Sequence, residues 1–223
     1  MRAIKPIAVI AMLALTVSVA AAARIDVGRF SAGDLTGWKE KSFVANTRYA
    51  VQTSGGQRAL CASSTAAASG LFHEIRIDLR KTPLLNWSWK VERGLHDKDE
   101  RSKPGDDYPA RVYVVFSGGF AFWKTRAINY VWSSAQPVGA IWPNAFVSNA
   151  RMVVVETGSS RLGQWVTEQR DVLADYRKLF GDAADYVDAV AIMTDTDNAG
   201  GSAAACYGDI YFEVAGALGT EPD

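Results

Sequence analysis

The chain has 223 residues, of which 48% are hydrophobic and 22% are charged, with 24 basic and 24 acidic side chains. This apolar content can bury a core, so the composition excludes a disordered chain, a collagen-like repeat and a disulfide-dense miniprotein. A module that binds nucleic acid normally carries an excess of cations, which this chain lacks. We therefore expect no nucleic-acid partner.

The first 23 residues differ in composition from the rest. Arg2 and Lys5 precede an apolar run, Ile7–Val19, which is followed by the alanines Ala20–Ala23. A charged start, a short apolar stretch and small residues at the cleavage point are typical of a secretory signal peptide. An uncleaved membrane anchor would need about 20 apolar residues. We therefore expect a signal peptide over residues 1–23, a single mature domain over 24–223, no membrane span after cleavage, and a periplasmic or secreted location.

Eight segments have the chemistry of strands, because they are rich in β-branched and aromatic residues and are bounded by turn-forming residues. They are Ala59–Ser63, Leu71–Leu79, Leu85–Glu92, Ala110–Phe116, Ile128–Ser133, Met152–Thr157, Val187–Thr194 and Tyr207–Val214. In the fourth segment Val112, Val114 and Phe116 share one face, which is expected to face the core. The opposite face carries Arg111 and Tyr113, a polar and aromatic pair that suits contact with a ligand.

One stretch has a helical period. Asp171 is placed to cap its start and Gly181 its end. Between them, apolar residues recur at helical spacing at Val172, Tyr176, Leu179 and Phe180. Many strands, one helix and turn-rich connections predict an all-β sandwich of jelly-roll or galactose-binding-like type with one short helix.

The chain has two cysteines, Cys61 and Cys206, and both lie in expected strands. In an oxidising compartment they can form a disulfide if their strands are neighbours. The alternative is that they are two small buried hydrophobic residues. The sequence leaves both alternatives open.

Six phrases of the sequence resemble one known family when they are taken together. They are LNWSWKVE (Leu85–Glu92), KPGDDYPARVYVVF (Lys103–Phe116), INYVWS (Ile128–Ser133), Gln164–Phe180 with its DYRKLF ending, AIMTDTDN (Ala191–Asn198) and YGDIYFE (Tyr207–Glu213). They resemble the bacterial secreted family catalogued as domain of unknown function 3047, over about Phe30 to Val214. That resemblance implies no established activity. YGDIYFE is also similar to the last strand of carbohydrate-binding jelly-roll modules, which implies a sandwich fold and a glycan ligand.

Polar residues gather around the fourth expected strand. Asp106 and Asp107 end a charged loop, Gly94–Asp107, and Arg111 and Tyr113 follow on the outer face of the strand. Such groups can hold sugar hydroxyls in bidentate hydrogen bonds, while an aromatic ring stacks on the sugar.

The predicted stacking surface comes from Tyr130 and Trp132, with Trp87 as a further candidate. The predicted ligand-binding residues are therefore Asp106, Asp107, Arg111, Tyr113, Tyr130 and Trp132. The alternative is structural: an Asp–Arg pair holds the loop, and the large aromatic residues fill the core.

A second loop, Asp195–Gly201, is rich in oxygen donors. Asp195, Asp197 and Asn198 supply three side-chain oxygens, and Asp209 can add one from the last expected strand. Ca²⁺ takes six to eight oxygen ligands, and extracellular domains use such ions. We expect no required cofactor but a structural calcium ion at these four residues. The alternative is an Asx turn. This loop departs from the family pattern, because Ala199-Gly200-Gly201 follows where a Thr is expected.

The sequence contains no strong enzyme signature. Nucleophile elbows, Walker loops, dinucleotide fingerprints and zinc motifs are absent. With only two histidines, His73 and His96, a His-based zinc site would need carboxylates or cysteines to complete its ligands. A polysaccharide lyase needs a base and a group that neutralises a uronate, for which the candidates are Tyr113, His73, Arg76, Arg111 and Asn129. A glycosidase needs two carboxylates, for which the candidates are Glu74, Glu92, Asp106, Asp107 and Glu156. No catalytic residue is assigned.

These observations favour a non-catalytic module that binds an envelope or extracellular glycan. One alternative is a polysaccharide lyase or hydrolase, which would bring Tyr113, His73 and an arginine into one cleft. The other is a protein-interaction or structural component of the envelope, which would present its outward aromatic residues as a flat patch.

Overall fold

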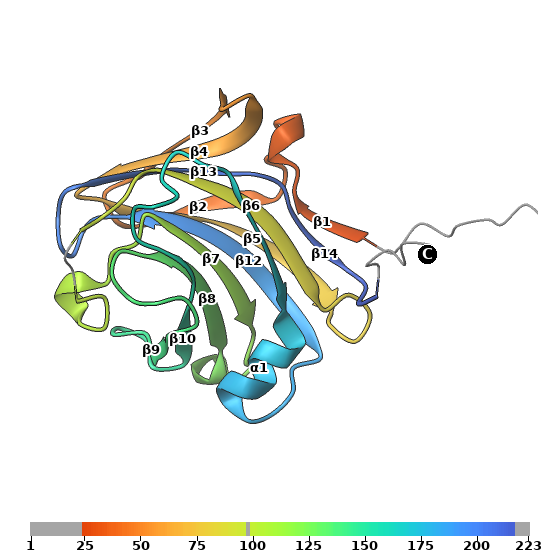
Figure 1. Cartoon of the computed structure of the whole chain (residues 1–223). Helices are drawn as coiled ribbons and strands as arrows, with labels where there is room; N and C mark the ends of the chain where they lie inside the picture. Colours follow the sequence, from red (N-terminus) through yellow and green to blue (C-terminus); the bar gives the residue numbers. More distant parts are fainter. Residues whose placement is uncertain (1–23, 97–98, 217–223) are drawn as a thin grey trace, which may run out of the picture.

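The computed structural model describes residues 24–96 and 99–216, and the predicted signal peptide lies outside them. Within these residues the strands form two sheets that face each other, with the helix α1 at one end (Figure 1). The fold is an all-β sandwich of jelly-roll type with one short α-helix, as the strand pattern predicts.

The first sheet is called the β6 sheet after its central strand. Its strands, in spatial order, are β1 (Arg24–Gly28), β14 (Ile210–Glu213), β6 (Leu84–Arg93), β13 (Ser202–Tyr207), β4 (Gln57–Thr65) and β3 (Arg48–Ser54), with β11 (Val166–Asp171) paired to β6. All pairs in this sheet are antiparallel.

The second sheet is called the β7 sheet. Its order is β2 (Trp38–Val44), β5 (Ala68–Asp78), β12 (Tyr186–Asp195), β7 (Ala110–Phe116), β8 (Arg126–Ser133), β10 (Ala150–Thr157) and β9 (Ile141–Pro143). β8 and β10 are parallel, and the other pairs are antiparallel. Three short 3₁₀ helices lie in the connections, at Phe30–Ala32, Lys103–Gly105 and Phe122–Lys124.

The core lies between the inner faces of the two sheets. On β7 the residues Val112, Val114 and Phe116 are buried there, which confirms the predicted alternation. Aromatic side chains of both sheets fill the centre, and the Trp87 ring lies 5.4 Å from the Tyr130 ring between their centroids. Every second residue of the β7 sheet therefore points away from the core and is free to form a site on the outer face.

The helix α1 (Val172–Phe180) forms where the sequence predicts it. The Asp171 side chain accepts a hydrogen bond from Ala174 N at 2.9 Å, and Gly181 ends the helix in the left-handed conformation with φ of 79°. Val172 and Tyr176 bury the apolar face of the helix against the core.

The two cysteines form a disulfide across neighbouring strands. Cys61 on β4 lies opposite Cys206 on β13 in the register of the β6 sheet. The structure therefore decides between the two alternatives that the sequence leaves open. Among the described residues, no helix is long and apolar enough to cross a membrane.

Candidate functional site

A groove of about 520 Å³ lies on the outer face of the β7 sheet. Strand alternation builds its floor, because the residues next to buried core positions point outward. The floor residues are Ala68 and Phe72 on β5, Met193 on β12, Arg111 and Tyr113 on β7, Ala127 and Asn129 on β8, and Ala150 on β10. The floor thus combines small residues, which leave room, with aromatic and polar side chains.

Two apolar walls rise on either side of this floor. Phe43 and Val44 come from the end of β2, and Phe146 and Val147 come from the segment between β9 and β10. Phe43 is 53% exposed and Phe146 is 52% exposed, which leaves their rings accessible to a ligand. Contact of these apolar rings with water is unfavourable. A ligand that packs on them would remove that contact.

Asn144 fixes the second wall to the floor. Its Nδ2 donates to both carboxylate oxygens of Asp106, at 3.0 and 2.9 Å. Its Oδ1 accepts from the backbone nitrogens of Phe146 and Val147, each at 3.0 Å. One amide therefore joins the charged end of the groove to its aromatic wall.

Arg111 is buried at the charged end, with 4% of its surface exposed. Its Nε donates to Asp195 Oδ1 at 2.8 Å, its Nη2 also pairs with Asp195 Oδ2, and its Nη2 donates to the backbone oxygen of Asp106 at 2.9 Å. Its Cζ lies 4.4 Å from the centroid of the Tyr108 ring. These contacts engage the guanidinium with protein groups, so Arg111 supports the floor rather than reaching for a ligand.

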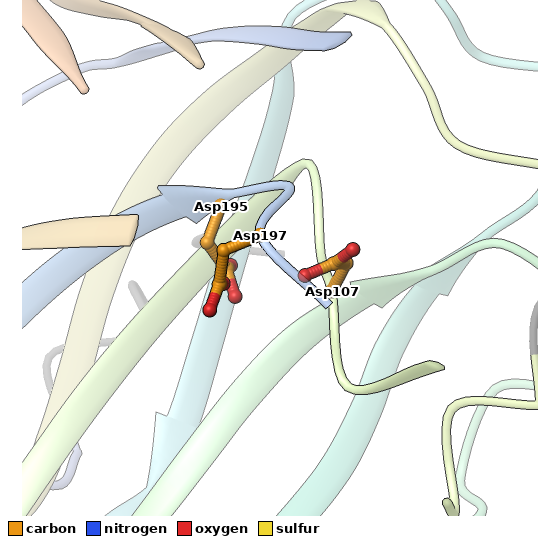
Figure 2. Close-up of side chains that lie close together, drawn as sticks. All are labelled: Asp107, Asp195 and Asp197. Carbon is orange, nitrogen blue, oxygen red and sulfur yellow. The ribbon is translucent and has the colours of Figure 1, made fainter. Parts of the chain in front are cut away.

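Three carboxylates meet beside this guanidinium. Figure 2 shows Asp195 and Asp197 at the end of β12 and Asp107 on the segment that leads into β7. One oxygen from each of the three lies within 4.8 Å of the others. The pairing of β12 with β7 brings these segments together although 88 positions separate Asp107 from Asp195 in the chain.

Asp107 holds the turn after β12. Its Oδ1 accepts from Asn198 N at 3.0 Å, and its Oδ2 accepts from Ala199 N at 2.6 Å. Asp197 is only half-buried and lines the groove. Burial, followed by the neighbouring Asp107, raises the pKa of Asp197. Burial also raises the pKa of Asp106, while Arg111 acts in the opposite direction.

Asn129 is the unusual residue of the floor. It is 1% exposed, and its buried side-chain Oδ1 has no hydrogen-bond partner among the residues that the structure describes. Its register partners are Tyr113 on β7 and Met152 on β10. Buried amide oxygens are normally hydrogen-bonded, so an unpaired one in the floor of a groove indicates a position for a ligand.

The predicted stacking surface of Tyr130 and Trp132 is wrong. Tyr130 is 0% exposed and Trp132 is 1% exposed, and both belong to the core cluster between the sheets, as does Trp87. On β8 the even-numbered residues point inward, so Asn129 rather than Tyr130 faces the groove. The aromatic rings at the groove are Tyr113, Phe72, Phe43 and Phe146 instead.

The structure does not bring Asp209 to the other predicted calcium ligands. Asp209 accepts hydrogen bonds from Ser31 N at 2.8 Å and from Ser31 Oγ at 2.6 Å. The expected strand Tyr207–Val214 is divided into β13 and β14, and Asp209 lies between them. The six residues of β13, about 20 Å, therefore separate Asp209 from the turn at Asp197 and Asn198.

The cluster of Asp107, Asp195 and Asp197 fits a calcium ion poorly. Arg111 engages both oxygens of Asp195, and the backbone amides after β12 engage both oxygens of Asp107. Ca²⁺ takes six to eight oxygen ligands, and few of the oxygens here remain unengaged. Calcium binding at Asp195, Asp197 and Asn198 stays a prediction.

The residues of the predicted lyase site lie apart. His73 Nδ1 is 2.8 Å from the backbone oxygen of Val27, and its ring packs against Trp38, away from the groove. Arg76 pairs with Asp188 at 3.0 Å and lines a different pocket. Only Tyr113, Arg111 and Asn129 of that set line the groove. Burial raises the pKa of Tyr113, which makes it a poorer base at neutral pH.

The candidate glycosidase carboxylates are also dispersed. Glu92 pairs with Lys90, and Glu156 pairs with Arg161 at 2.7 Å. Asp106 is the member of that set that lines the groove, next to Asp107. Four aromatic residues, Phe43, Phe72, Tyr113 and Phe146, line the groove, whereas the exposed Phe120 and Trp123 lie outside it.

Several residues of the groove are not predicted from the sequence. Asn144, Phe146 and Val147 lie in a segment without strand or helix periodicity, and Phe43 lies in β2, which is too polar to be recognised as a strand. Asn129 is named by the sequence only as a lyase candidate, although the alternation of β8 already places it opposite to the apolar residues Ile128 and Tyr130.

A family model matches residues 36–211 of the sequence. The chain belongs to the family described as protein of unknown function (DUF3047). This membership confirms the resemblance of the six sequence phrases. No curated protein matches the sequence of this member of the family.

Solved structures similar to this DUF3047 protein include glycan-related sandwiches. One is the family 11 carbohydrate-binding module of the cellulosomal cellulase Lic26A-Cel5E of Clostridium thermocellum, with a TM-score of 0.46 and 11% identity over 88% of this chain and 97% of that chain. Another is the endoglucanase cel12A from Rhodothermus marinus, with a TM-score of 0.48 and 10% identity over 86% of this chain and 100% of that chain. At such low sequence identity and TM-score, these similarities do not indicate the chemistry of the groove. That chemistry follows only from the residues that line the groove in this chain.

Proposed function

We propose that this protein is a non-catalytic binding module for a glycan of the cell envelope or the extracellular space, and that the glycan lies in the groove of the β7 sheet. The observation that carries the proposal is the unpaired, buried side-chain oxygen of Asn129 in the floor of an aromatic-walled groove. A ligand hydroxyl that donates to Asn129 Oδ1 removes the cost of leaving that oxygen unpaired.

The walls of the groove suit the two kinds of surface that a sugar ring presents. A pyranose has an apolar face of C–H groups, which packs on aromatic rings such as Phe72, Tyr113 and Phe146. Its edge carries hydroxyl groups, which bind amides and carboxylates. The groove crosses β5, β12, β7, β8 and β10, about 19 Å at the usual strand spacing, which accommodates more than one sugar ring.

The charged side chains of the groove are paired with other protein groups, which supports binding rather than catalysis. Arg111 and Asp195 satisfy each other, and Asp106 is held by Asn144. A general acid or base must exchange a proton with the substrate, which these contacts oppose. The cross-strand disulfide supports a periplasmic or secreted location, because disulfides persist in oxidising compartments.

A matched pair of substitutions tests the site. Ala127→Trp places a large ring in the groove floor, whereas Ala50→Trp places the same ring on the exposed face of β3 in the other sheet. Thermal shift against neutral, acidic and amino glycans identifies the ligand, because a ligand that binds the native state raises Tm. We expect the shift to survive in Ala50→Trp and to disappear in Ala127→Trp. A shift that persists in both variants, or no shift with any glycan, would contradict the proposal.

A further inference from the structure

The side chains that line the groove carry more negative than positive charges. Asp106, Asp195 and Asp197 line it, and Arg111 is its one lining cation among the residues that the structure describes. Asp107 adds a further carboxylate within 4.8 Å of two of these acids. This end of the groove therefore carries an excess of negative charge, and its potential favours cationic groups in a ligand over anionic ones.

Arg111 cannot offset this excess for an incoming anion. Its Nε and Nη2 are engaged by Asp195, and its Nη1 faces Asp106 Oδ2 at 3.7 Å. A uronate or sulfate would have to displace a buried carboxylate to reach the guanidinium. Breaking such a buried pair is strongly unfavourable, so the groove disfavours acidic glycans.

Two lysines lie beside the aromatic rings of the walls. Lys41 Nζ lies 5.3 Å from the centroid of the Phe43 ring, and Lys103 Nζ lies 5.3 Å from that of Phe146. Both residues are exposed and neither lines the groove. Solvent and salt screen them from the floor more strongly than they screen the half-buried carboxylates.

Asp197 is the carboxylate that a ligand can reach. It lines the groove, it is half-buried, and within the described residues it accepts one side-chain hydrogen bond, from Asn198 Nδ2 at 3.2 Å, and forms no salt bridge. Burial and Asp107 raise its pKa, while Arg111 acts in the opposite direction without forming a salt bridge to it, so compensation of its charge is incomplete. An ammonium group next to Asp197 supplies that compensation.

Asn129 gives an independent indication that the groove holds a ligand. Its side-chain Oδ1 is unpaired and buried in the same floor, next to Tyr113. The acidic end and the unpaired amide oxygen therefore belong to one cavity. An amino sugar offers both kinds of donor that these groups need, an ammonium for the carboxylate and a hydroxyl for the amide oxygen.

We infer that the ligand class is a glycan with free amino groups, whose ammonium binds Asp197 while its sugar rings lie over Asn129 and the aromatic walls. This inference rests on the proposed function and names its ligand. The same groove binds the N-acetylated form of the glycan more weakly, because acetylation removes the charge.

Titration calorimetry with four hexasaccharides tests the inference, using glucosamine, N-acetylglucosamine, glucose and mannuronate hexamers. We expect the glucosamine hexamer to bind about fivefold more tightly than the N-acetylglucosamine hexamer, the strength of a partly exposed ion pair. In Asp197→Asn this ratio falls to about one. In the control Asp185→Asn, which makes the same charge change at an exposed position outside the groove, the ratio is retained.

The other outcomes overturn the inference in distinguishable ways. A ratio of one in the wild type, tightest binding of the mannuronate hexamer, or a ratio that falls equally in Asp185→Asn shows that Asp197 does not select an amine, while the groove remains a glycan site. Absence of binding by all four hexamers, together with no thermal shift on the wider glycan panel, overturns the proposed function itself.

Discussion

Replacing Asn129 by leucine separates a binding role from a structural one. The wild-type fold leaves the side-chain Oδ1 of Asn129 buried and unpaired, which costs about 1–3 kcal/mol of desolvation. Leucine has a similar size and no polar atom, and its neighbours would include Tyr113 and Met152. We therefore expect Asn129→Leu to raise the free energy of unfolding by about 1 kcal/mol and to weaken glycan binding at the same time.

A second buried asparagine serves as the control. Asn86 on β6 has a satisfied amide: its Nδ2 donates to Leu84 O at 3.2 Å and to Glu213 Oε1 at 2.9 Å, and its Oδ1 accepts from Gln169 Nε2 at 2.8 Å. Asn86→Leu leaves these partners unpaired, so we expect it to lower the free energy of unfolding by about 1–3 kcal/mol.

Urea denaturation followed by fluorescence and circular dichroism measures both variants, with the disulfide kept oxidised. Coincidence of the two signals is needed for a two-state free energy. The reasoning is refuted if Asn129→Leu destabilises the fold as much as Asn86→Leu does, because Asn129 would then have a structural role. It is also refuted if Asn129→Leu binds the glycan as tightly as the wild type.

Three further predictions concern buried charge and the disulfide. Arg111→Ala should lower the free energy of unfolding by about 3–5 kcal/mol, because it leaves aspartates buried without their cation; a loss below about 1 kcal/mol in urea denaturation would contradict the structural role of Arg111. Burial raises the pKa of Glu168 from 4.5 to about 7, so the folded state retains a proton that the unfolded state has released. Wild-type stability should therefore fall by about 1–2 kcal/mol through Glu168, after allowance for solvent screening, as the pH rises from 4.5 through 7. Glu168→Gln should show a fall smaller by that amount in a series of denaturation curves, and an unchanged pH profile would show that other groups titrate. Replacing Cys61 and Cys206 by alanine should cost about 2–5 kcal/mol, since the bridge closes a long loop; equal melting temperatures of the variant and the oxidised wild type would argue against this stabilisation.

Local patterns in the sequence predict the fold well where the chain has one apolar face. Ala110–Phe116 and Val172–Phe180 have the predicted bounds, because strand alternation and helix capping are determined by neighbouring residues. β2, β3 and β11 are polar on most of their length and lie at or near sheet edges, so no apolar run marks them. β2 and β11 pair with strands distant in the chain, whereas β3 forms a hairpin with the next strand, β4.

The candidate site is less predictable because it depends on contacts between distant segments. Arg111 and Tyr113 are recognised by alternation on one strand, and the structure places both in the groove. The ion pair of Arg111 with Asp195 requires the register of β7 against β12, which no local pattern contains. Tyr130 and Trp132 were wrongly predicted to stack on a sugar ring because they are aromatic. The alternation of their strand already directs both side chains into the core.

The central claim is that a glycan lies on the outer face of the β7 sheet, over Asn129. An NMR titration of ¹⁵N-labelled protein with the glycan that gives the largest thermal shift tests it most directly. We predict that the side-chain amide signal of Asn129 moves, together with backbone amides of β7, β8 and the end of β12, while β3 and β4 are unaffected. Shifts confined to the β6 sheet, or to the separate pocket around Arg76 and Tyr186, would contradict the claim.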